Sequence, residues 1–400
     1  MIKSLKRYFN YFTITLFARK ERGIVMRDLF SYYFTKSFQK QIHSAEKKKL
    51  ALEKAIGWLL QAQHSTSDKG FATYRIIEGW TSSYPETSGY ILPTMLAYVK
   101  YSGKKELHSN IIACADWLLK IQKSSGGWQS MYVDDDRPEV VFNTAQVIRG
   151  LAEVHQLTGD KKYLDSAVKA CDWLCSIQEA NGSWKKFAFM NAERVYDSYV
   201  DHPLLMIYKI TGNENYRIAA VKNLEWIITT QQQANGWFSN CDNTLKHNDC
   251  PITHTIAYTI DGLLESGLLL NDQRFINAAK KSADALLEIY TKNNCINGRY
   301  DKNWNGSEYL ICTGSAQLAI VWLKLYKLYK NETYLYGASK MNTMLAFIQQ
   351  RNYNESADTT GAMPGSFPIW GKYEPFAFPN WATKYFADAL LLELELNKTR

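Results

Sequence analysis

The sequence predicts an all-α protein folded as an (α/α)6 toroid, a ring of six helical hairpins, with a basic aromatic N-terminal helical arm. Three observations predict this fold: a repeat, two alternating kinds of helix, and alternating long and short connections. The repeat recurs at intervals of 59, 56, 53, 60 and 59 residues, and periods of this length are typical of repeat architectures. Its clearest copy reads Trp117-Leu118, then Gln122, then Gly126-Gly127-Trp128. The other copies start at Trp58, Trp173, Trp226, Leu286 and Leu345, with Gln63, Gln178, Gln231, Gly298 and Gln349 after them.

Two kinds of helix alternate within each period. The first, as in residues 108–122, has apolar residues at helical spacing on one face and ends in the repeated motif. The second, as in residues 142–157, is apolar on most faces and stops at a glycine such as Gly159. A helix that is apolar on most faces is buried. We therefore expect the second kind to form an inner ring and the first kind an outer ring.

The hairpins follow one another along the chain with regular connections. Links from outer to inner helix take about 20 residues, and links from inner to outer helix about five. Loops this long in a compact fold are usually functional, and all of them lead to the N-terminal ends of inner helices. The expected pairs, outer then inner, are 46–63 with 88–101, 108–122 with 142–157, 162–178 with 195–210, 215–231 with 254–268, 273–290 with 313–328, and 333–349 with 381–395.

The charge of the chain is concentrated at its N-terminus. Residues 1–50 hold twelve Lys and Arg against three Asp and Glu, so the net charge of +8 comes from this segment and the rest is close to neutral. A neutral ring argues against nucleic acid as a partner. We divide the chain into a basic aromatic arm, 1–45, and a toroidal catalytic domain, 46–400. The arm is too short in apolar residues to span a membrane; it either contacts an anionic membrane surface or packs on the ring.

Seven cysteines are scattered along the chain without a C-x-x-C pair. An odd number at irregular spacing favours a reducing compartment over a disulfide framework, although a bridge between Cys241 and Cys250 stays open. We expect a cytoplasmic protein, with peripheral contact at the inner membrane face as the alternative location. The oligomeric state is not predicted.

Polar residues gather where the first three long loops reach the inner helices. The first loop brings Glu86 beside Tyr84 and Tyr90, the second brings Asn143, and the third brings Arg194. Helix capping is the alternative role for Glu86 and Asn143. The third loop also supplies Tyr196, Asp197 and Asp201 as substrate-binding candidates. The acidic triplet 134–136 is expected either to bind a cation or to be solvated.

The fourth loop is the most informative, because Pro251 and Thr253 mark a helix start that places His254 and Tyr258 on one face. This pair suits proton transfer, and a hydrogen-bonded structural histidine is the alternative. The fifth loop contributes Trp304. The sixth is rich in proline and aromatic residues, including Trp370 and Trp381; it either stacks on sugar rings or plugs the ring.

The motif from Trp117 to Trp128 resembles the QW repeat of triterpene cyclases, and the period is similar to that of protein prenyltransferase β subunits. The ring is equally similar to six-hairpin glycosidases, toroidal polysaccharide lyases and glucuronyl C5-epimerase helical domains. These resemblances cover about residues 46–396. The phrase from His254 to Glu265 is similar to the inner helices of sugar-active toroids. Together with the segments 84–86 and 365–368, it resembles uncharacterised proteins of bacterial surface-polysaccharide biosynthesis. Asp249, Cys250 and His254 do not have prenyltransferase zinc spacing, so no metal and no cofactor are expected.

The sequence therefore favours an enzyme that modifies an acidic polysaccharide or lipid-linked glycan by removing the C5 proton of a uronate, as a lyase or an epimerase. His254 would be the base and Tyr258 the acid or an alternative base. Asn143 and Arg194 would stabilise the enolate-like charge. The side chains that would stack on sugar rings are Trp370, Trp381 and Tyr90. The first alternative is a glycoside hydrolase that uses Glu86 with Asp197 or Asp201. The others are a non-catalytic glycan-binding component of a polysaccharide assembly machinery and a terpenoid cyclase.

Overall fold

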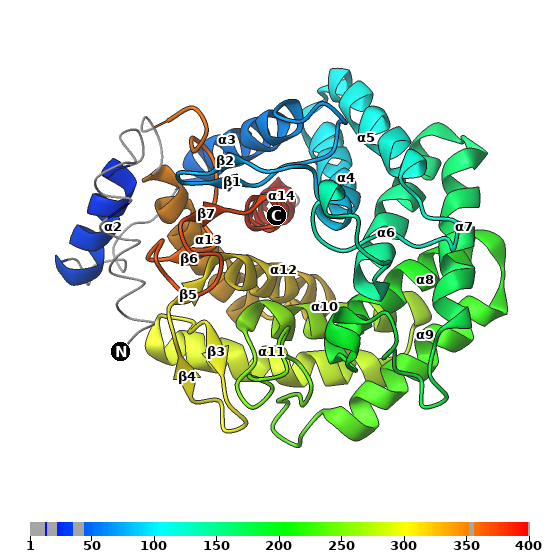
Figure 1. Ribbon diagram of the computed structural model, residues 1–400. Helices are drawn as coiled ribbons and strands as arrows, with labels where there is room; N and C mark the ends of the chain where they lie inside the picture. Colours follow the sequence, from blue (N-terminus) through cyan, green and yellow to red (C-terminus); the bar gives the residue numbers. More distant parts are fainter. Residues whose placement is uncertain (1–12, 14–21, 35–43, 352–355, 399–400) are drawn as a thin grey trace.

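The computed structural model describes residues 13, 22–34, 44–351 and 356–398. Within these residues, six outer and six inner helices form two concentric rings (Figure 1). The outer helices are α3 (Ala45–His64), α5 (His108–Lys120), α7 (Lys161–Ser176), α9 (Glu214–Trp226), α11 (Gln273–Asn293) and α13 (Glu332–Gln350). The inner helices are α4 (Pro85–Ser102), α6 (Val141–Thr158), α8 (Ser198–Thr211), α10 (Thr253–Leu270), α12 (Cys312–Tyr329) and α14 (Asn380–Lys398). The (α/α)6 toroid is confirmed.

The inner ring is closed, because each inner helix packs against the next and α14 packs back against α4. The two ends of the toroid are joined by a buried ion pair between Lys48 of α3 and Glu393 of α14, 2.5 Å apart. Asn342 of α13 donates to the other oxygen of Glu393. The inner-to-outer links are shorter than expected: from α6 to α13 they contain two residues each, as between Thr158 and Lys161.

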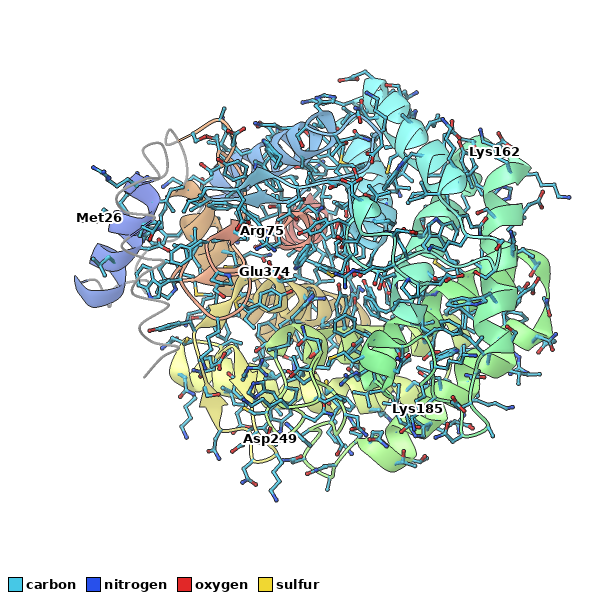
Figure 2. The ribbon with its side chains drawn as sticks, viewed as in Figure 1. Met26, Arg75, Lys162, Lys185, Asp249 and Glu374 are labelled. Atoms are coloured by element: carbon cyan, nitrogen blue, oxygen red, sulfur yellow. The ribbon has the colours of Figure 1, made fainter. Side chains whose placement is uncertain are left out.

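Glycines allow close contact between neighbouring inner helices. A Cβ at Gly150 of α6 would lie 2.2 Å from the carbonyl oxygen of Gly89 in α4, and one at Gly262 of α10 would lie 2.4 Å from the backbone of Ser198 in α8. Only glycine fits at such contacts. The inner ring is consequently narrow enough for side chains to fill most of it, as Figure 2 shows.

The repeated motif fastens one hairpin to the next. Gln122 donates from its amide to the carbonyl oxygens of Gly126 in its own loop and Ser166 in α7, at 2.8 and 2.9 Å. Gly126, with φ of 109°, lies directly on the backbone of Lys169. Trp128 donates to the carbonyl of Leu118 and is fully buried. Gln63, Gln178 and Gln349 make equivalent double bonds at other junctions.

In the fourth copy the fastening residue is Gln232, not Gln231 as the sequence suggested. A π-helical turn, Ile227–Gln231, follows α9 and inserts one residue into the helix end. The amide of Gln232 then donates to the carbonyl of Ala278 and the hydroxyl of Ser282. Gln231 instead donates to its neighbour Thr230.

Short antiparallel strand pairs, which the sequence analysis did not anticipate, hold the long loops together on one rim. A three-stranded sheet has the order β2-β1-β7, from Gly79–Trp80, Tyr74–Arg75 and Ala377–Phe378. In it, Tyr74 faces Phe378 and so connects the first loop with the last. The other pairs are β3 (Arg299–Tyr300) with β4 (Gly306–Ser307), and β5 (Leu310–Ile311) with β6 (Ser366–Phe367).

The described part of the N-terminal arm contains α2 (Arg22–Phe34), which packs on the sixth loop. Buried Asp28 accepts the backbone N–H of Ile369 and pairs with Arg351 at 2.9 Å. The packed alternative therefore applies to this helix, while the aromatic run around residues 8–17 lies almost wholly outside the described residues. Among the helices of the described chain, none has the length and apolar character needed to cross a membrane.

All seven cysteines lie in described positions and are free thiols. Cys241 is buried and close to Thr259 of α10, whereas Cys250 is partly exposed near Ser307. The open alternative of a Cys241–Cys250 bridge is not realised in the structure.

Candidate active site

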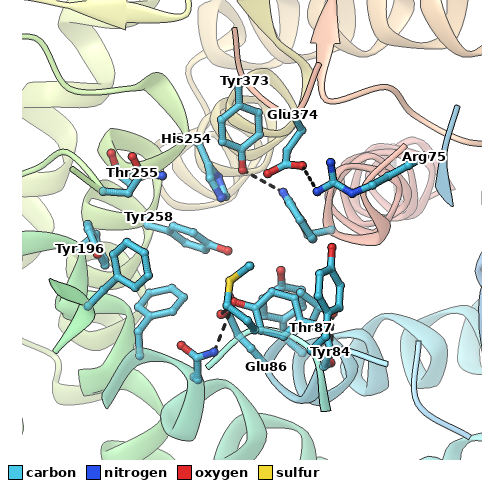
Figure 3. A pocket seen from close by; sticks show the side chains of 18 residues that line it. Arg75, Tyr84, Glu86, Thr87, Tyr196, His254, Thr255, Tyr258, Tyr373 and Glu374 are labelled. Carbon is cyan, nitrogen blue, oxygen red and sulfur yellow. Dashed lines mark hydrogen bonds and ion pairs between the residues drawn. The ribbon is translucent and has the colours of Figure 1, made fainter. Parts of the chain in front are cut away.

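A cavity of about 290 Å³ lies at the N-terminal ends of the inner helices (Figure 3). Residues from the start of α4, α6 and α10 meet there with residues of the long loops. Most of its lining is aromatic, and polar groups converge at a few points. The lining consists of Arg75, Tyr84, Glu86, Thr87, Tyr90, Met131, Tyr132, Phe142, Asn143, Phe189, Tyr196, Asn243, His254, Thr255, Tyr258, Tyr373, Glu374 and Trp381.

Glu86 lies on one wall, one residue after Pro85 begins α4. Its carboxyl is buried and accepts a hydrogen bond from the hydroxyl of Tyr84 at 2.7 Å. The amide of Asn143 donates to the same hydroxyl at 3.3 Å. Burial raises the pKa of Glu86 to about 7, although the bond from Tyr84 opposes the rise. A carboxyl with this pKa can hold and release a proton near neutral pH.

Neither Glu86 nor Asn143 is a helix cap. The N-cap of α4 is Tyr84 and that of α6 is Val140, so both polar side chains sit inside the first turn. They are free to face the cavity, and both line it. The capping alternative is therefore wrong for both residues.

His254 lies across the cavity in the first turn of α10. Its Nδ1 is 2.7 Å from Oε1 of Gln317 in α12. An amide oxygen only accepts, so Nδ1 carries the proton and Nε2 keeps its lone pair. Burial lowers the pKa of His254 to about 4. The ring is therefore neutral near pH 7 and its Nε2 is able to accept a proton.

Tyr258 follows His254 by one helical turn, and the two ring centres are 4.5 Å apart. Its ring also packs on Phe142 and Tyr199, at 4.9 and 4.8 Å. The hydroxyl is buried and makes no hydrogen bond of normal geometry with the described residues. It interacts with the hydroxyls of Tyr90 and Tyr385 and lines the cavity.

The third wall comes from the sixth loop and the three-stranded sheet. Glu374 pairs with Arg75 of β1 at 3.0 Å, and Tyr373 accepts a bond from the indole of Trp381 at 2.9 Å. Burial raises the pKa of Glu374, while Arg75 opposes this. Arg75 and Glu374 lie side by side in Figure 2. Neither residue was predicted from the sequence, because Arg75 belongs to no motif and Glu374 stands out only as an acidic residue within an aromatic loop.

Tyrosine rings close the bottom of the cavity. Tyr90 and Tyr258 line it, and Tyr385 packs beneath them with ring centres at 5.6 and 5.8 Å. Tyr199 lies beside Tyr258, and the guanidinium of Arg149 stacks on its far face at 4.2 Å. These four tyrosines are almost fully buried. The cavity is consequently blind, because this floor blocks the axis of the toroid.

Three polar candidates from the third loop do not reach the cavity. Arg194 is fully buried and donates to the backbone carbonyls of Asp242 and Phe189, so it joins two loops. Asp197 and Asp201 are also fully buried, and burial raises the pKa of both. A 3₁₀ turn, Val195–Asp197, precedes α8. It directs Tyr196 into the cavity and its neighbour Asp197 away from it.

Of the aromatic candidates, Tyr84, Tyr90, Tyr196 and Trp381 line the cavity, but Trp304 and Trp370 do not. Trp304 donates to the carbonyl of Asn235 and packs on Tyr300 at the outer rim. Trp370 belongs to the buried core. Both residues were predicted to bind substrate only because they lie in long loops, and the position of a residue in a loop does not determine where its side chain points.

The acidic triplet is exposed on the rim outside the cavity lining. Asp134 accepts a bond from Ser82, Asp135 pairs with Arg137, and Asp136 lies near Lys123. Across the described residues, no group of three or more His, Cys, Asp and Glu side chains is arranged to hold a metal ion. The triplet therefore fits the solvated alternative.

Comparison with known proteins identifies similar rings. Residues 92–206 match the family model described as the squalene-hopene cyclase C-terminal domain, which covers less than a third of the chain. No curated protein matches. An unsaturated glucuronyl hydrolase specific for heparin superposes with a TM-score of 0.70 and 16% identity, over 89% of this chain and 99% of that one.

Two further solved structures are comparable. The unsaturated glucuronyl hydrolase of Bacillus sp. GL1 has a TM-score of 0.68 and 14% identity, over 86% of this chain and 96% of that one. The enzyme of Streptococcus agalactiae has a TM-score of 0.65 and 14% identity, over 88% and 93%. The predicted likeness to six-hairpin glycosidases and to the cyclase repeat is confirmed for the fold.

Proposed function

We propose that this protein is a carbohydrate-active enzyme that hydrolyses a glycosidic bond at the end of a glycan chain, with Glu86 as the proton donor. The observation that carries the proposal is a buried carboxyl with a pKa of about 7 inside a blind, aromatic-walled cavity. Aromatic faces suit the apolar faces of sugar rings. The solved structures with similar rings include hydrolases named for an unsaturated glucuronyl group.

Hydrolysis needs a proton for the leaving oxygen and a base for the attacking water. Glu86 would give its proton to the glycosidic oxygen as the bond to C1 breaks, and the oxygen of water would form the new bond to C1. Glu374 lies on the opposite wall in Figure 3 and would take the proton of that water. Its pairing with Arg75 favours the ionised form that a base requires. Glu374 thus takes the role that the sequence analysis gave to Asp197 or Asp201.

The shape of the cavity points to the chain terminus. Its volume of about 290 Å³ and its tyrosine floor leave room for an end of a glycan but no exit on the far side. Arg75 is the permanent cation among the lining residues. A uronate is therefore the sugar that we propose for the terminal position, with its carboxylate near Arg75.

Proton abstraction from C5 of a uronate is the second candidate function. It is favoured by one observation, the adjacent rings of His254, whose Nε2 is unprotonated, and Tyr258, both of which line the cavity. It is weakened by the position of Arg194, which lies outside the cavity and leaves the enolate-like charge without that cation. The terpenoid cyclase has less support, because the acidic triplet does not line the cavity.

The two reactions give different products from uronate oligosaccharides. Hydrolysis adds one water and creates a reducing end, whereas elimination creates a double bond that absorbs ultraviolet light. We expect the hydrolytic product by mass spectrometry. Glu86→Gln should lower kcat at least about 100-fold, as is usual for loss of a general acid, while Asp134→Asn on the exposed rim should match the wild type.

Three results would redirect the assignment. An ultraviolet-absorbing product that disappears in His254→Ala and Tyr258→Phe would select elimination. Full activity of Glu86→Gln would refute the role of Glu86. Tight oligosaccharide binding without any product would select the non-catalytic, glycan-binding alternative.

A further inference from the structure

Two neighbouring loops at the mouth of the cavity expose large apolar side chains. We name residues 185–191 and 243–247 the docking loops. Phe189, Met190 and Leu245 are 36%, 53% and 55% exposed. Phe189 and Asn243 also line the cavity, so this surface continues into its mouth. Clustered exposed apolar side chains mark interaction sites more often than isolated ones do.

The docking loops are held together as one unit. Arg194, buried between them, donates to the carbonyl of Asp242 at 2.7 Å and to that of Phe189 at 3.4 Å. The N–H of Val195 donates to the carbonyl of Asn240. Phe187 and Met190 both have a φ of 62°, which non-glycine residues adopt only when their surroundings impose it. The exposed apolar groups are thus presented by a fixed backbone.

The docking loops are also basic. Lys185, Lys186 and Lys246 are exposed, and neither loop contains an acidic residue. The nearest acids in the sequence are Asp242, which is buried and paired with Arg299, Glu193, which accepts bonds from Asn181 and Ser183, and exposed Asp249. Lys185 lies on the opposite side of the molecule from Met26 of α2 in Figure 2. This positive surface is therefore separate from α2.

We propose that the docking loops bind the surface of an anionic lipid bilayer, with Met190 and Leu245 inserted among the lipids and the three lysines at the headgroups. Such a combination of apolar insertion and lysines is how proteins lie on anionic membranes. The mouth of the cavity would then face the bilayer, where a glycan carried on a lipid presents its sugars. The statement about a lipid-carried glycan rests on the proposed function, whereas binding of the docking loops to a bilayer does not.

An acidic polysaccharide is the other polyanion that the lysines could attract. The bilayer fits better because Met190 and Leu245 are aliphatic, and aliphatic side chains gain more from burial among acyl chains than from contact with hydroxyl-rich sugars. The lining of the cavity, by contrast, is mostly aromatic.

The test measures sedimentation of the full-length protein with phosphatidylcholine vesicles, with and without phosphatidylglycerol. We expect binding that requires phosphatidylglycerol and weakens with salt. The variants Met190→Ser/Leu245→Ser and Lys185→Glu/Lys186→Glu/Lys246→Glu should each lower the partition coefficient at least about tenfold. The control variant Leu157→Ser/Ile218→Ser changes two apolar residues that are 39% and 44% exposed elsewhere and should bind like the wild type.

Other outcomes would overturn the proposal. Equal binding of wild type and docking-loop variants would assign any membrane contact to another part of the chain. Loss of binding to soluble heparin with unchanged vesicle binding would assign the loops to an acidic polysaccharide. Hydrolysis of a soluble oligosaccharide should be unchanged in Met190→Ser/Leu245→Ser, so failure of the docking proposal and failure of the proposed function give different results.

Discussion

At the scale of single residues, burial has opposite effects on the two titratable groups that face each other in the cavity. It raises the pKa of Glu86 to about 7 and lowers that of His254 to about 4. Between these values both side chains are mostly uncharged. The Arg75–Glu374 pair is then the main charged feature of the lining. Burial therefore favours the uncharged form of both groups, so that near neutral pH Glu86 can keep a proton while His254 stays a neutral imidazole.

The raised pKa of Glu86 predicts a pH-dependent stability. The unfolded chain has the ordinary value of 4.5, so the folded state holds the proton more tightly and stability falls as pH rises through about 7. The difference corresponds to about 3 kcal/mol. Urea unfolding at pH 5 and pH 8 should show Glu86→Gln gaining stability relative to the wild type at pH 8, by up to this amount. The amide keeps an oxygen to accept from Tyr84.

The control for this prediction is Glu78→Gln. Its side chain is 72% exposed on the rim, so the variant should track the wild type at both pH values. If Glu86→Gln also tracked the wild type, the carboxyl would have to be solvated, and its role as a proton donor near neutral pH would lose its physical basis.

The sequence located part of this site. Glu86, Asn143 and His254 were predictable because each lies in the first turn of an inner helix, and those turns meet at one rim; Tyr258 lies one turn after His254 on the same face. The positions of Arg194 and Asp197 outside the cavity were not predictable, since the direction of a side chain in a loop or 3₁₀ turn depends on its neighbours. Glu374 could not be linked to Arg75, because their pairing depends on the contact between β1 and β7.

At the scale of elements, the repeated glutamine acts as a clamp between consecutive hairpins. Gln122→Leu should lower the free energy of unfolding by about 1–3 kcal/mol, because it leaves the carbonyls of Gly126 and Ser166 without a donor. Gln231→Leu is the matched control, since Gln231 donates to its neighbour Thr230, accepts from Asn240 and makes no double bond across the hairpin junction, and its effect should be smaller, at about 1 kcal/mol or less. Urea unfolding measures both. Equal losses would mean that the π-helical turn does not transfer the clamp to Gln232.

The repeated glutamine also shows which structural features the sequence periodicity predicts and which it does not. Twelve helices and their pairing follow from a regular pattern of apolar residues and stops. The shift of the bonding residue from Gln231 to Gln232 cannot be predicted from this pattern, because a π-helical turn arises from local packing and leaves the spacing of apolar residues almost unchanged.

At the scale of the whole molecule, the ring depends on a bond between its ends. Lys48 of α3 bonds to Glu393 and Ser339 and is 4% exposed. Lys48→Met should lower the free energy of unfolding by about 3–5 kcal/mol, because it leaves the carboxylate of Glu393 buried with Asn342 as its remaining donor. Chemical denaturation measures the change.

A surface pair of the same type provides the comparison. Lys161→Met removes the partner of Asp165 on α7, where the side chains are 80% and 61% exposed, and should change stability by less than about 0.5 kcal/mol. The double variant Lys48→Met/Glu393→Leu should recover part of the loss of Lys48→Met. A small effect of Lys48→Met would mean that packing of α3 on α14 alone closes the ring.

The tyrosine floor has a kinetic consequence. Tyr90, Tyr258 and Tyr385 close the cavity along the axis of the toroid. A molecule that enters the cavity must therefore leave through the same opening. If the proposed hydrolysis takes place in this cavity, a freed sugar has to leave before the shortened chain can enter, so the polymer should be released after each cleavage and turnover should be distributive. The same geometry makes the released sugar a competitor for the entrance, and product inhibition should therefore be competitive with substrate.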